Sequence, residues 1–311
     1  MAKILITESV HPIGPELLTA AGHTVVYADR DMDVIRREIV DADAVLVRII
    51  ELPGSLLATA KNLKIVSKHG VGYDNIDLDY CKSHGIAVTI TPNANSLSVA
   101  EHAFTLMLTL AKNIIPVSNE YRTVGFAAKN HAPGIEMTGK TLGLIGMGRI
   151  GKHILHMCRD GLDMHVIVYD PYISEVPEGV EKVDDLSELL RRADVVMLHC
   201  LLTDETRKLI DRERLALMKP TALLINCARG PIVDEAALIE ALENGRLAGA
   251  GLDVTDPEPV APDSPLFKLP NVIVTPHYAP TTVESATRVS KIAAENINAV
   301  LAGQEPVGRI V

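Results

Sequence analysis

Residues 141–155 of the chain read TLGLIGMGRIGKHIL, an apolar segment followed by a glycine-rich turn and a segment of helical character. Gly146, Gly148 and Gly151 have the spacing GxGxxG. Between a strand and a helix, the first glycine allows a tight turn and the second lets backbone approach a pyrophosphate. The third lets the helix pack closely on the strand. The stretch therefore predicts a dinucleotide-binding βα turn, with the pyrophosphate at the helix N-terminus.

An acidic residue follows at the distance that such a turn requires. The strand expected at 165–169 ends at Asp170, about 20 residues past Gly151, where a ribose-binding acid is expected. A carboxylate there accepts hydrogen bonds from ribose hydroxyls and repels a 2′-phosphate, which favours NAD over NADP. The alternative is a structural glycine turn with a solvated aspartate. The agreement of turn, context and acid favours the cofactor site.

Apolar segments alternate with helical segments along most of the chain. The strands that we predict lie at 3–7, 23–27, 44–47, 63–66 and 86–90, and then at 141–145, 165–169, 195–199, 222–225, 250–253 and 272–275. Regular alternation of strand and helix predicts an α/β fold with parallel sheets covered on both faces. The length of 311 residues suggests two domains, the second of them larger.

Three helical features connect these segments. Ser98 is the expected N-cap of a long apolar helix, with Glu101 three residues later as in a capping box. This helix is expected to end near Lys112 and to be followed by a weakly periodic connecting arm at 113–138. The last helix, at about 283–301, follows the strands of the second domain and could pack back onto the first domain.

The composition excludes several classes of protein. Apolar residues make up 47% and charged residues 23%, a balance typical of globular proteins. With 30 Lys and Arg against 40 Asp and Glu, the formal charge is −10, and there is no concentrated basic run. Phosphate backbones are held mainly by Lys and Arg, so we expect no nucleic-acid partner. Aromatic residues are only 3%, so the core must be aliphatic.

Cysteines and apolar runs indicate the compartment. Four cysteines lie far apart without a CxxC pair, which predicts neither a disulfide framework nor a metal site; they are Cys81, Cys158, Cys200 and Cys227. We expect reduced thiols in a cytoplasmic protein. The chain start does not resemble a signal peptide, and the apolar run at 99–111 is too short for a bilayer. We also expect no regulatory module after Val311.

Three segments at strand ends of the second domain carry candidate catalytic groups. Arg229 follows a buried strand and could bind a carboxylate with its two-pronged guanidinium. Asp253, Asp256 and Glu258 share one short loop with two prolines. His277 follows the strand at 272–275 and could exchange a proton near neutral pH. A surface arginine, a solvated acidic loop and a structural histidine are the alternative interpretations.

Together these groups suit hydride chemistry on a 2-oxo acid. That reaction needs a cation for the carboxylate and carbonyl, a proton donor for the nascent alkoxide, and a carboxylate that keeps the donor charged. Spacing along the chain does not show that the groups meet in space. It also does not select which of the three acids lies beside the histidine.

The sequence resembles the D-isomer-specific 2-hydroxyacid dehydrogenase family, especially its phosphoglycerate and hydroxypyruvate/glyoxylate members. The resemblance covers nearly the whole chain. Besides the glycine turn, it rests on GVGYDNID at 70–77, SVAEH at 98–102, LHCLLTDET at 198–206, NCARG at 226–230, Glu258-Pro259 and Thr275-Pro276-His277. Such a series of motifs in order is highly specific.

The resemblance implies a fold, a set of domains and a set of site residues. It implies two Rossmann-like domains, with an NAD-binding domain and dimerisation arm at 98–283 inserted into a flavodoxin-like substrate domain at 1–97 plus 284–311. It implies a catalytic trio of Arg229, Glu258 and His277. The residues that match cofactor contacts are Gly146, Gly148, Arg149, Ile150, Gly151, Asp170, Cys200, Leu201, Thr206, Ala228 and Asp253. Those that match substrate contacts are Arg48, Val71 and Gly72.

The chain departs from the family pattern at three places. Leu201 stands where a proline is common, and Tyr278-Ala279-Pro280 replaces the frequent sequence of an apolar residue, Ala and Gly after the histidine. Ile49 follows Arg48 where phosphoglycerate members often have a hydroxyl-bearing residue. These departures concern substrate range more than chemistry, and support for a phosphorylated substrate is partial.

The resemblance implies an NAD-dependent oxidoreductase that interconverts a small 2-oxo acid and its D-2-hydroxy acid. The arm implies a homodimer. The alternatives are an NAD-sensing, corepressor-like binding protein on the same fold and a phosphite dehydrogenase-like enzyme. Formate enzymes of the family carry an amide where Glu258 stands, so this chain fits them poorly.

Overall fold

The computed structural model describes residues 1–311, and the chain forms two compact units. Unit 1 comprises Met1–Asn95 and Pro280–Val311, and unit 2 comprises Ser96–Ala279. Unit 2 is thus one continuous segment inserted into unit 1. The α/β fold with two parallel sheets that the sequence predicts is confirmed.

Unit 1 contains a five-stranded parallel sheet in the order β2-β1-β3-β4-β5. Its strands are β1 (Lys3–Ile6), β2 (Thr24–Tyr27), β3 (Ala44–Val47), β4 (Ile65–Lys68) and β5 (Ala87–Thr89). Every residue of β3 and β4 is buried. The helices that cover both faces of a parallel sheet explain why these strands read as continuous apolar runs.

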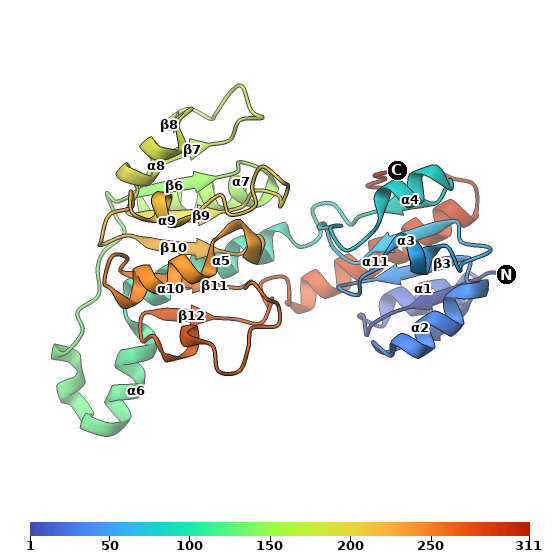
Figure 1. The fold of residues 1–311 in the computed structure, drawn as a ribbon, viewed down its shortest axis with the longest axis horizontal. Helices are drawn as coiled ribbons and strands as arrows, with labels where there is room; N and C mark the ends of the chain where they lie inside the picture. The colour runs from blue at the N-terminus through green and yellow to red at the C-terminus, as the bar shows by residue number, and fades with distance from the viewer. The chain divides into compact units, whose positions relative to one another are not determined.

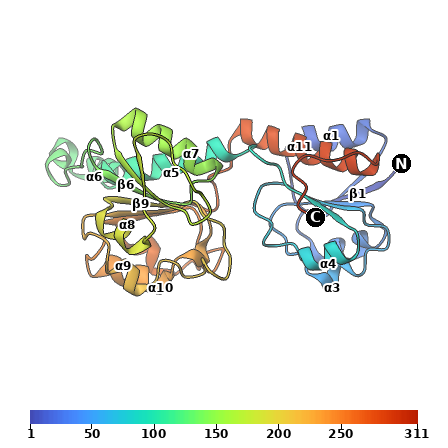
Figure 2. The same cartoon turned by 90° about the horizontal axis from the view of Figure 1, so that it is seen from above.

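Helices cover both faces of this sheet, with α1 and α11 on one face and α3 and α4 on the other (Figure 2). The helices of unit 1 are α1 (Ile13–Ala20), α2 (Met32–Glu38), α3 (Gly54–Leu57), α4 (Leu78–Ser83) and α11 (Val283–Leu301). The predicted return of the last helix is confirmed. The Ser67 hydroxyl of β4 donates a hydrogen bond to the Ala293 carbonyl of α11 at 3.0 Å.

Unit 2 contains a seven-stranded parallel sheet in the order β12-β11-β10-β9-β6-β7-β8 (Figure 1). Its strands are β6 (Thr141–Ile145), β7 (His165–Tyr169), β8 (Val180–Lys182), β9 (Val195–Leu198), β10 (Leu223–Asn226), β11 (Gly249–Leu252) and β12 (Val272–Val274). The order of successive strands in the sheet reverses between β6 and β9, which are parallel neighbours, and their carboxyl ends lie at one edge, where ligands bind in such sheets.

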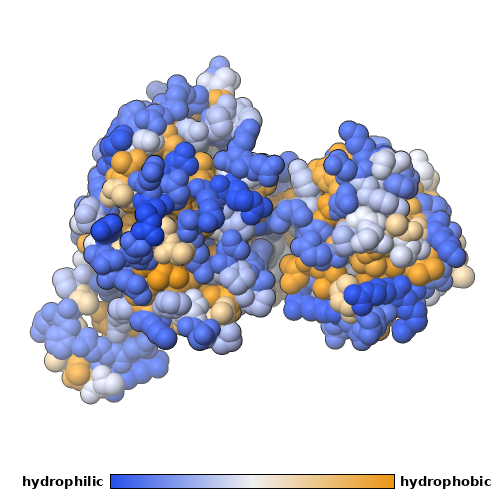
Figure 3. Space-filling view, in the orientation of Figure 1, coloured by the Kyte–Doolittle hydropathy of each residue, from blue (hydrophilic) through white to orange (hydrophobic).

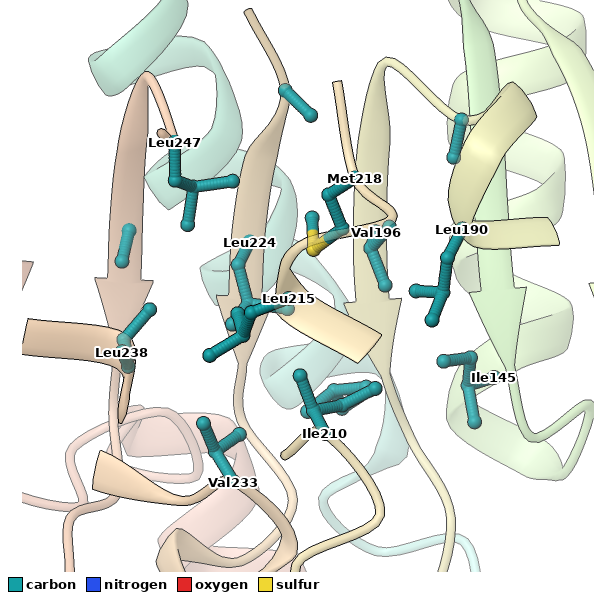
Figure 4. Close-up of a cluster of buried hydrophobic side chains, with 14 of the residues drawn as sticks. Ile145, Leu190, Val196, Ile210, Leu215, Met218, Leu224, Val233, Leu238 and Leu247 are labelled. Carbon is teal, nitrogen blue, oxygen red and sulfur yellow. The ribbon is translucent and has the colours of Figure 1, made fainter. Parts of the chain in front are cut away.

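Two apolar layers hold the helices of unit 2 on its sheet. Helices α5 (Ser96–Ala111) and α7 (Arg149–Leu155) lie on one face, and α8 (Leu186–Arg192), α9 (Arg212–Leu215) and α10 (Glu235–Glu243) lie on the other (Figure 2). Figure 4 shows the second layer, in which aliphatic side chains such as Leu190, Leu215 and Leu238 meet residues of the sheet. The core is aliphatic, as the composition predicts.

The structure corrects two details of the sequence analysis. Ser98 is not an N-cap, because α5 already begins at Ser96, and both serines are buried. Strand β8 was not predicted, because its three residues are partly exposed at the sheet edge and lack an apolar pattern. The other strands differ from their predicted ranges by two residues or fewer at either end.

The connecting arm contains more helix than its weak periodicity indicates. Residues Ile114–Val124 form α6, and a 3-10 helix follows at Gly125–Asn130. No residue of α6 is buried in the chain. The segment instead exposes a mixture of apolar and polar side chains (Figure 3). None of the helices in the structure is long and apolar enough to span a membrane.

Candidate active site

The glycine turn between β6 and α7 is shaped by its own close packing. Gly146 has φ +93°, and a Cβ on it would lie 2.8 Å from the Cys200 amide nitrogen. A Cβ on Gly151 would lie 2.5 Å from the Gly146 carbonyl oxygen. Both positions therefore require glycine even in the absence of a ligand, because a side chain would displace the backbone.

Gly148 differs from the other two glycines of the turn. A Cβ on it would meet nothing within 4 Å, and its backbone lies in an extended conformation. Gly148 is also the N-cap of α7, and no side chain caps this helix end. The space beside Gly148 and the uncapped amides of the first helical turn fit the pyrophosphate of a dinucleotide.

Asp170 lies at the carboxyl end of β7 and faces the same turn. Its Oδ2 accepts a hydrogen bond from the Met147 amide at 2.8 Å, and its Oδ1 accepts one from the Tyr172 amide at 3.0 Å. Each carboxylate oxygen has a second lone pair, so both can still accept from a ribose hydroxyl. The two amides fix the carboxylate beside the glycine turn, and its contact with a ribose stays a prediction.

The segment after β9 contributes further predicted cofactor contacts. The Thr206 hydroxyl donates to the Leu201 carbonyl at 2.6 Å and accepts from the Thr203 amide at 2.7 Å, which closes a compact turn. The Leu201 side chain is 65% exposed. Burial raises the pKa of the Cys200 thiol to about 11, so this side chain is uncharged at pH 7.

Asn226 and Gly230 determine the path of the backbone around Arg229. The buried Asn226 side chain donates to the Arg229 carbonyl at 2.9 Å and accepts from the Ala228 amide at 3.0 Å. A Cβ on Gly230 would lie 1.9 Å from the Thr255 carbonyl oxygen. The turn that carries Arg229 is therefore packed directly on the loop that leads to Glu258.

The Glu258 loop is anchored on its other side by α10. Glu235 accepts a hydrogen bond from the Asp256 amide at 2.9 Å. Burial raises the pKa of Glu235 above its ordinary value, with the Asp256 charge as a further cause. Two independent contacts, at Gly230 and Glu235, thus hold the backbone within three residues of Glu258.

Glu258 and His277 form the central pair of the site. His277 Nδ1 lies 2.7 Å from Glu258 Oε1, and both side chains are partly exposed. Because the hydrogen bond occupies Nδ1, the other ring nitrogen, Nε2, is available to an external group. The structure thus selects Glu258, and neither Asp253 nor Asp256, as the partner of this histidine, as the family resemblance implies.

Asp253 organises the loop that carries His277. Its carbonyl accepts from the His277 amide at 2.8 Å, its Oδ1 from the Tyr278 amide at 2.7 Å and its Oδ2 from the Ala279 amide at 2.8 Å. The Thr275 hydroxyl also donates to Oδ1, at 2.5 Å. With 1% exposure and both oxygens engaged, Asp253 has a clear structural function. Its predicted contact with the nicotinamide stays a prediction.

The predicted substrate residues of unit 1 lie at the ends of β3 and β4. Buried Glu8 accepts from the amides of Arg48 and Ile49 at 2.7 and 2.9 Å. The Arg48 guanidinium donates to the Ser9 carbonyl at 3.0 Å. These contacts fix the Arg48 loop from the end of β1.

Val71 and Gly72 lie in the loop that follows β4. Buried Lys68 and Asn75 bracket this loop, and Lys68 Nζ donates to the Asn75 carboxamide oxygen at 2.6 Å. Lys68 Nζ also donates to the Arg48 carbonyl, and Asn75 donates to the Ile50 carbonyl at 2.7 Å. The two predicted substrate loops of unit 1 are therefore held together by a polar cluster.

Several of these positioning residues were missed by the sequence analysis. They are Glu8, Lys68, Asn75, Asn226, Glu235 and Thr275, together with His102 of α5. Each lies at or near the carboxyl end of a strand or contacts a residue there. A polar residue directly after a buried strand was the only signal available, and it does not reveal a partner that is distant in the sequence.

Comparisons with known proteins identify the family of the chain. The family model described as "D-isomer specific 2-hydroxyacid dehydrogenase, NAD binding domain" matches residues 104–279. The chain is 42% identical over 308 residues to a D-3-phosphoglycerate dehydrogenase of Methanocaldococcus jannaschii, covering 98% of this chain and 58% of that protein. The chain thus spans little more than half of the length of that relative.

Two further matches extend over most of both chains. A glyoxylate reductase of Thermofilum pendens is 38% identical over 319 residues, which cover 98% of this chain and 93% of that protein. The crystal structure of a D-lactate dehydrogenase from Aquifex aeolicus, complexed with NAD and lactic acid, superposes with a TM-score of 0.86 at 33% identity. That match covers 96% of each chain.

Proposed function

Because the chain belongs to the D-isomer-specific 2-hydroxyacid dehydrogenase family, we propose that it transfers a hydride between NAD and a small 2-oxo acid or D-2-hydroxy acid. The observation that carries this proposal is the 2.7 Å contact between His277 Nδ1 and Glu258 Oε1. It pairs a proton-exchanging group with a carboxylate in the unit that also contains the dinucleotide turn. This combination is what reduction of a carbonyl to an alcohol requires.

The cofactor residues proposed in unit 2 lie in the glycine turn and after the carboxyl ends of β7, β9, β10 and β11. Gly148 and the first amides of α7, including those of Arg149 and Ile150, would hold the pyrophosphate. Asp170 would bind the adenosine ribose and disfavour NADP, while Cys200, Leu201, Thr206, Ala228 and Asp253 would complete the site. When bound, the nicotinamide would donate or accept the hydride.

His277 is the proposed acid and base. With Nδ1 donated to Glu258, its Nε2–H would give a proton to the substrate oxygen during reduction and accept one during oxidation. Glu258 accepts the hydrogen bond from Nδ1 and fixes the orientation of the ring. Arg229 would bind the substrate carboxylate and stabilise negative charge developing on the carbonyl oxygen.

Substrate choice is proposed to involve Arg48, Val71 and Gly72 of unit 1. The amides of Val71 and Gly72 would hold the substrate carboxylate, and Arg48 adds a cation near its far end. Two relatives bear the names D-3-phosphoglycerate dehydrogenase and glyoxylate reductase, so a phosphorylated and a non-phosphorylated acid are the two candidates. The exposed Ile49, without a hydroxyl, favours a non-phosphorylated acid.

We further propose that the protein is a homodimer in the cytoplasm. The segment formed by α6 and the following 3-10 helix exposes large apolar side chains at Ile114, Ile115, Tyr121, Val124 and Phe126. Exposed apolar clusters of this kind are typical of subunit contacts. All four cysteines are free thiols, which fits a reducing compartment.

The deciding experiment is a set of parallel turnover assays. NADH oxidation is followed at 340 nm with hydroxypyruvate, glyoxylate, phosphohydroxypyruvate and pyruvate, and each assay is repeated with NADPH. Turnover of at least one acid, with a clear preference for NADH, is expected. NADH binding by calorimetry without turnover of any acid would instead favour an NAD-sensing protein. NAD reduction by phosphite alone would favour phosphite oxidation.

A further inference from the structure

Helix α5 places a second histidine against the loop that carries His277. His102 Nε2 lies 3.0 Å from the Thr275 hydroxyl and 3.5 Å from Asp253 Oδ1. Its ring also meets the Tyr278 ring edge-on, with centroids 6.2 Å apart and an interplanar angle of 63°. His102 therefore contacts the residues two positions before and one position after His277.

The direction of the hydrogen bonds follows from the donors available. Asp253 Oδ1 accepts from the Thr275 hydroxyl at 2.5 Å. A hydroxyl has one proton, so the Thr275 oxygen must accept from His102, whose Nε2 therefore carries hydrogen. A continuous series of hydrogen bonds runs from His102 Nε2–H through the Thr275 hydroxyl to the Asp253 carboxylate.

This series of hydrogen bonds ends at Asp253, the residue that holds the His277 loop. The carbonyl and carboxylate of Asp253 accept the amides of His277, Tyr278 and Ala279. His277 has φ 52°, a conformation that costs free energy for a residue with a side chain and persists only when its surroundings impose it. Contacts that fix Thr275, Tyr278 and Asp253 are therefore needed to keep the imidazole in place.

We propose that His102 is a positioning residue of the reaction, acting through Thr275 and Asp253 on the loop that presents His277. The inference rests on the proposed function for its kinetic test. His102 is 17% exposed in its side chain and lies outside the residues 104–279 that the family model matches. Its predicted effect is on turnover and on the order of the loop at residues 275–279.

The first test separates the effect of the His102 hydrogen bond from the effect of the volume of its side chain. His102→Leu removes the Nε2 donor, and His102→Gln keeps an amide N–H where Nε2 lies. We expect His102→Leu to lower kcat about 10-fold, because a small displacement of a catalytic group is costly, with the substrate KM within twofold. His102→Gln should restore kcat to within about threefold of wild type. Equal kcat values for His102→Leu and wild type, or equal losses in both variants, would overturn the proposal.

The second test asks whether His102 acts through Thr275. Thr275→Val removes the hydroxyl at almost constant volume. If the series of hydrogen bonds is continuous, the double variant His102→Leu/Thr275→Val should be no slower than Thr275→Val alone, since residues acting through one network are not additive. Losses that multiply in the double variant would contradict the proposed route. His165→Leu, which removes an exposed histidine at the start of β7, is the control.

A third measurement does not depend on activity. Amide hydrogen exchange of a peptide spanning residues 275–279 reports the order of the loop directly. Faster exchange in His102→Leu, reversed in His102→Gln, is expected. If the wild-type protein turns over none of the acids, the proposed function fails while this measurement still judges His102. Unchanged protection in His102→Leu would then overturn the inference.

Discussion

The hydrogen bond between His277 Nδ1 and Glu258 fixes the orientation of the imidazole ring. The backbone of His277 lies in the left-handed region, which determines the direction in which the side chain leaves the loop. Replacing it by alanine should lower kcat by on the order of 100-fold or more, because general acid–base transfer of the substrate proton is lost. The NADH Kd, measured by calorimetry, should stay within a factor of about three. Near-normal turnover would remove His277 from the assigned role.

The control for this substitution is His277→Asn. Asparagine tolerates the left-handed conformation better than alanine but cannot exchange a proton near neutral pH. We expect His277→Asn to retain the thermal stability of the wild-type protein and to lose as much activity as His277→Ala. A more active asparagine variant would mean that backbone strain, and not proton transfer, caused the loss.

Gly148 permits a second prediction at the level of one residue. Its Cβ position is open and its φ is −71°, so alanine fits the folded chain without strain. A methyl group there would instead occupy the space assigned to the pyrophosphate. Gly148→Ala should leave Tm within about 1 °C of wild type and weaken NADH binding at least 10-fold by calorimetry. Unchanged NADH affinity would contradict the assigned pyrophosphate position.

At the scale of elements, the turn after β10 and the loop after β11 pack directly against each other. A Cβ on Gly230 would lie 1.9 Å from the Thr255 carbonyl oxygen and 2.2 Å from its carbon. Gly230→Ala should therefore separate Arg229 from Glu258, destabilise the protein by about 3 kcal/mol and abolish turnover. Urea unfolding and the turnover assay measure the two effects.

A matched glycine controls the Gly230 substitution. Gly161 lies in the last turn of the helical segment that begins with α7, and a Cβ there would meet nothing within 4 Å. Gly161→Ala should be neutral or slightly stabilising, since it removes conformational freedom from the unfolded chain. If Gly230→Ala is as well tolerated as Gly161→Ala, the close packing of the two segments is not important for the site.

The α6 segment gives the prediction on assembly. Phe126, which is 73% exposed, and Ile115 are apolar side chains that a monomer would leave in water. A charged residue buried at a subunit contact is strongly unfavourable. The double variant Ile115→Glu/Phe126→Glu should sediment as a 33.6 kDa species at micromolar concentration, whereas the wild-type protein sediments as a dimer. A wild-type monomer would refute the proposed assembly.

Predictability from sequence followed the local strength of each signal. Strands such as β3, β6 and β7 were located because both faces are buried and their residues are almost all apolar. The edge strand β8 has no such pattern, and the start of α5 depends on the burial of Ser96, which only the folded unit determines. Local patterns predict elements better than their ends.

The residues of the candidate site could be predicted from the sequence better than the contacts between them. The sequence placed Arg229 and His277 at strand ends, but it offered three acids for one partnership, and only the resemblance favoured Glu258. The structure shows why Asp253 is different: its oxygens are used by backbone amides and by Thr275. The contact from His102 to Thr275 spans 173 residues, and no local pattern predicts a contact of that kind.

For the whole molecule, the buried histidines predict sensitivity to acid. Burial lowers the pKa of His199 to about 4, and neither of its buried ring nitrogens has a hydrogen-bond partner. Burial, with the Arg48 charge as a further cause, lowers the pKa of His69 to about 3. An unfolded histidine titrates near 6.5, so the unfolded chain binds more protons below that pH and stability falls as the pH falls toward 4.

The size of this effect can be measured at one position. His199 alone should lower the free energy of unfolding by roughly 2 kcal/mol when the pH falls from 7 to 5. The urea midpoint, followed by circular dichroism, should therefore fall less between these pH values in His199→Gln than in the wild-type protein. The His165→Leu variant, which removes an exposed ring, should keep the wild-type pH dependence. Parallel pH profiles for all three proteins would contradict the assigned burial effect.

The insertion of unit 2 between β5 and α11 has a consequence for synthesis on the ribosome. The five strands of unit 1 emerge first, yet α11, which lies with α1 on one face of their sheet, emerges only after the whole of unit 2. At ordinary rates of translation, on the order of 10 s or more separates the two events, and unit 2 emerges as one uninterrupted segment during that interval. The part of the nascent sheet that α11 covers in the folded unit therefore stays exposed to chaperones until residues 283–301 have emerged.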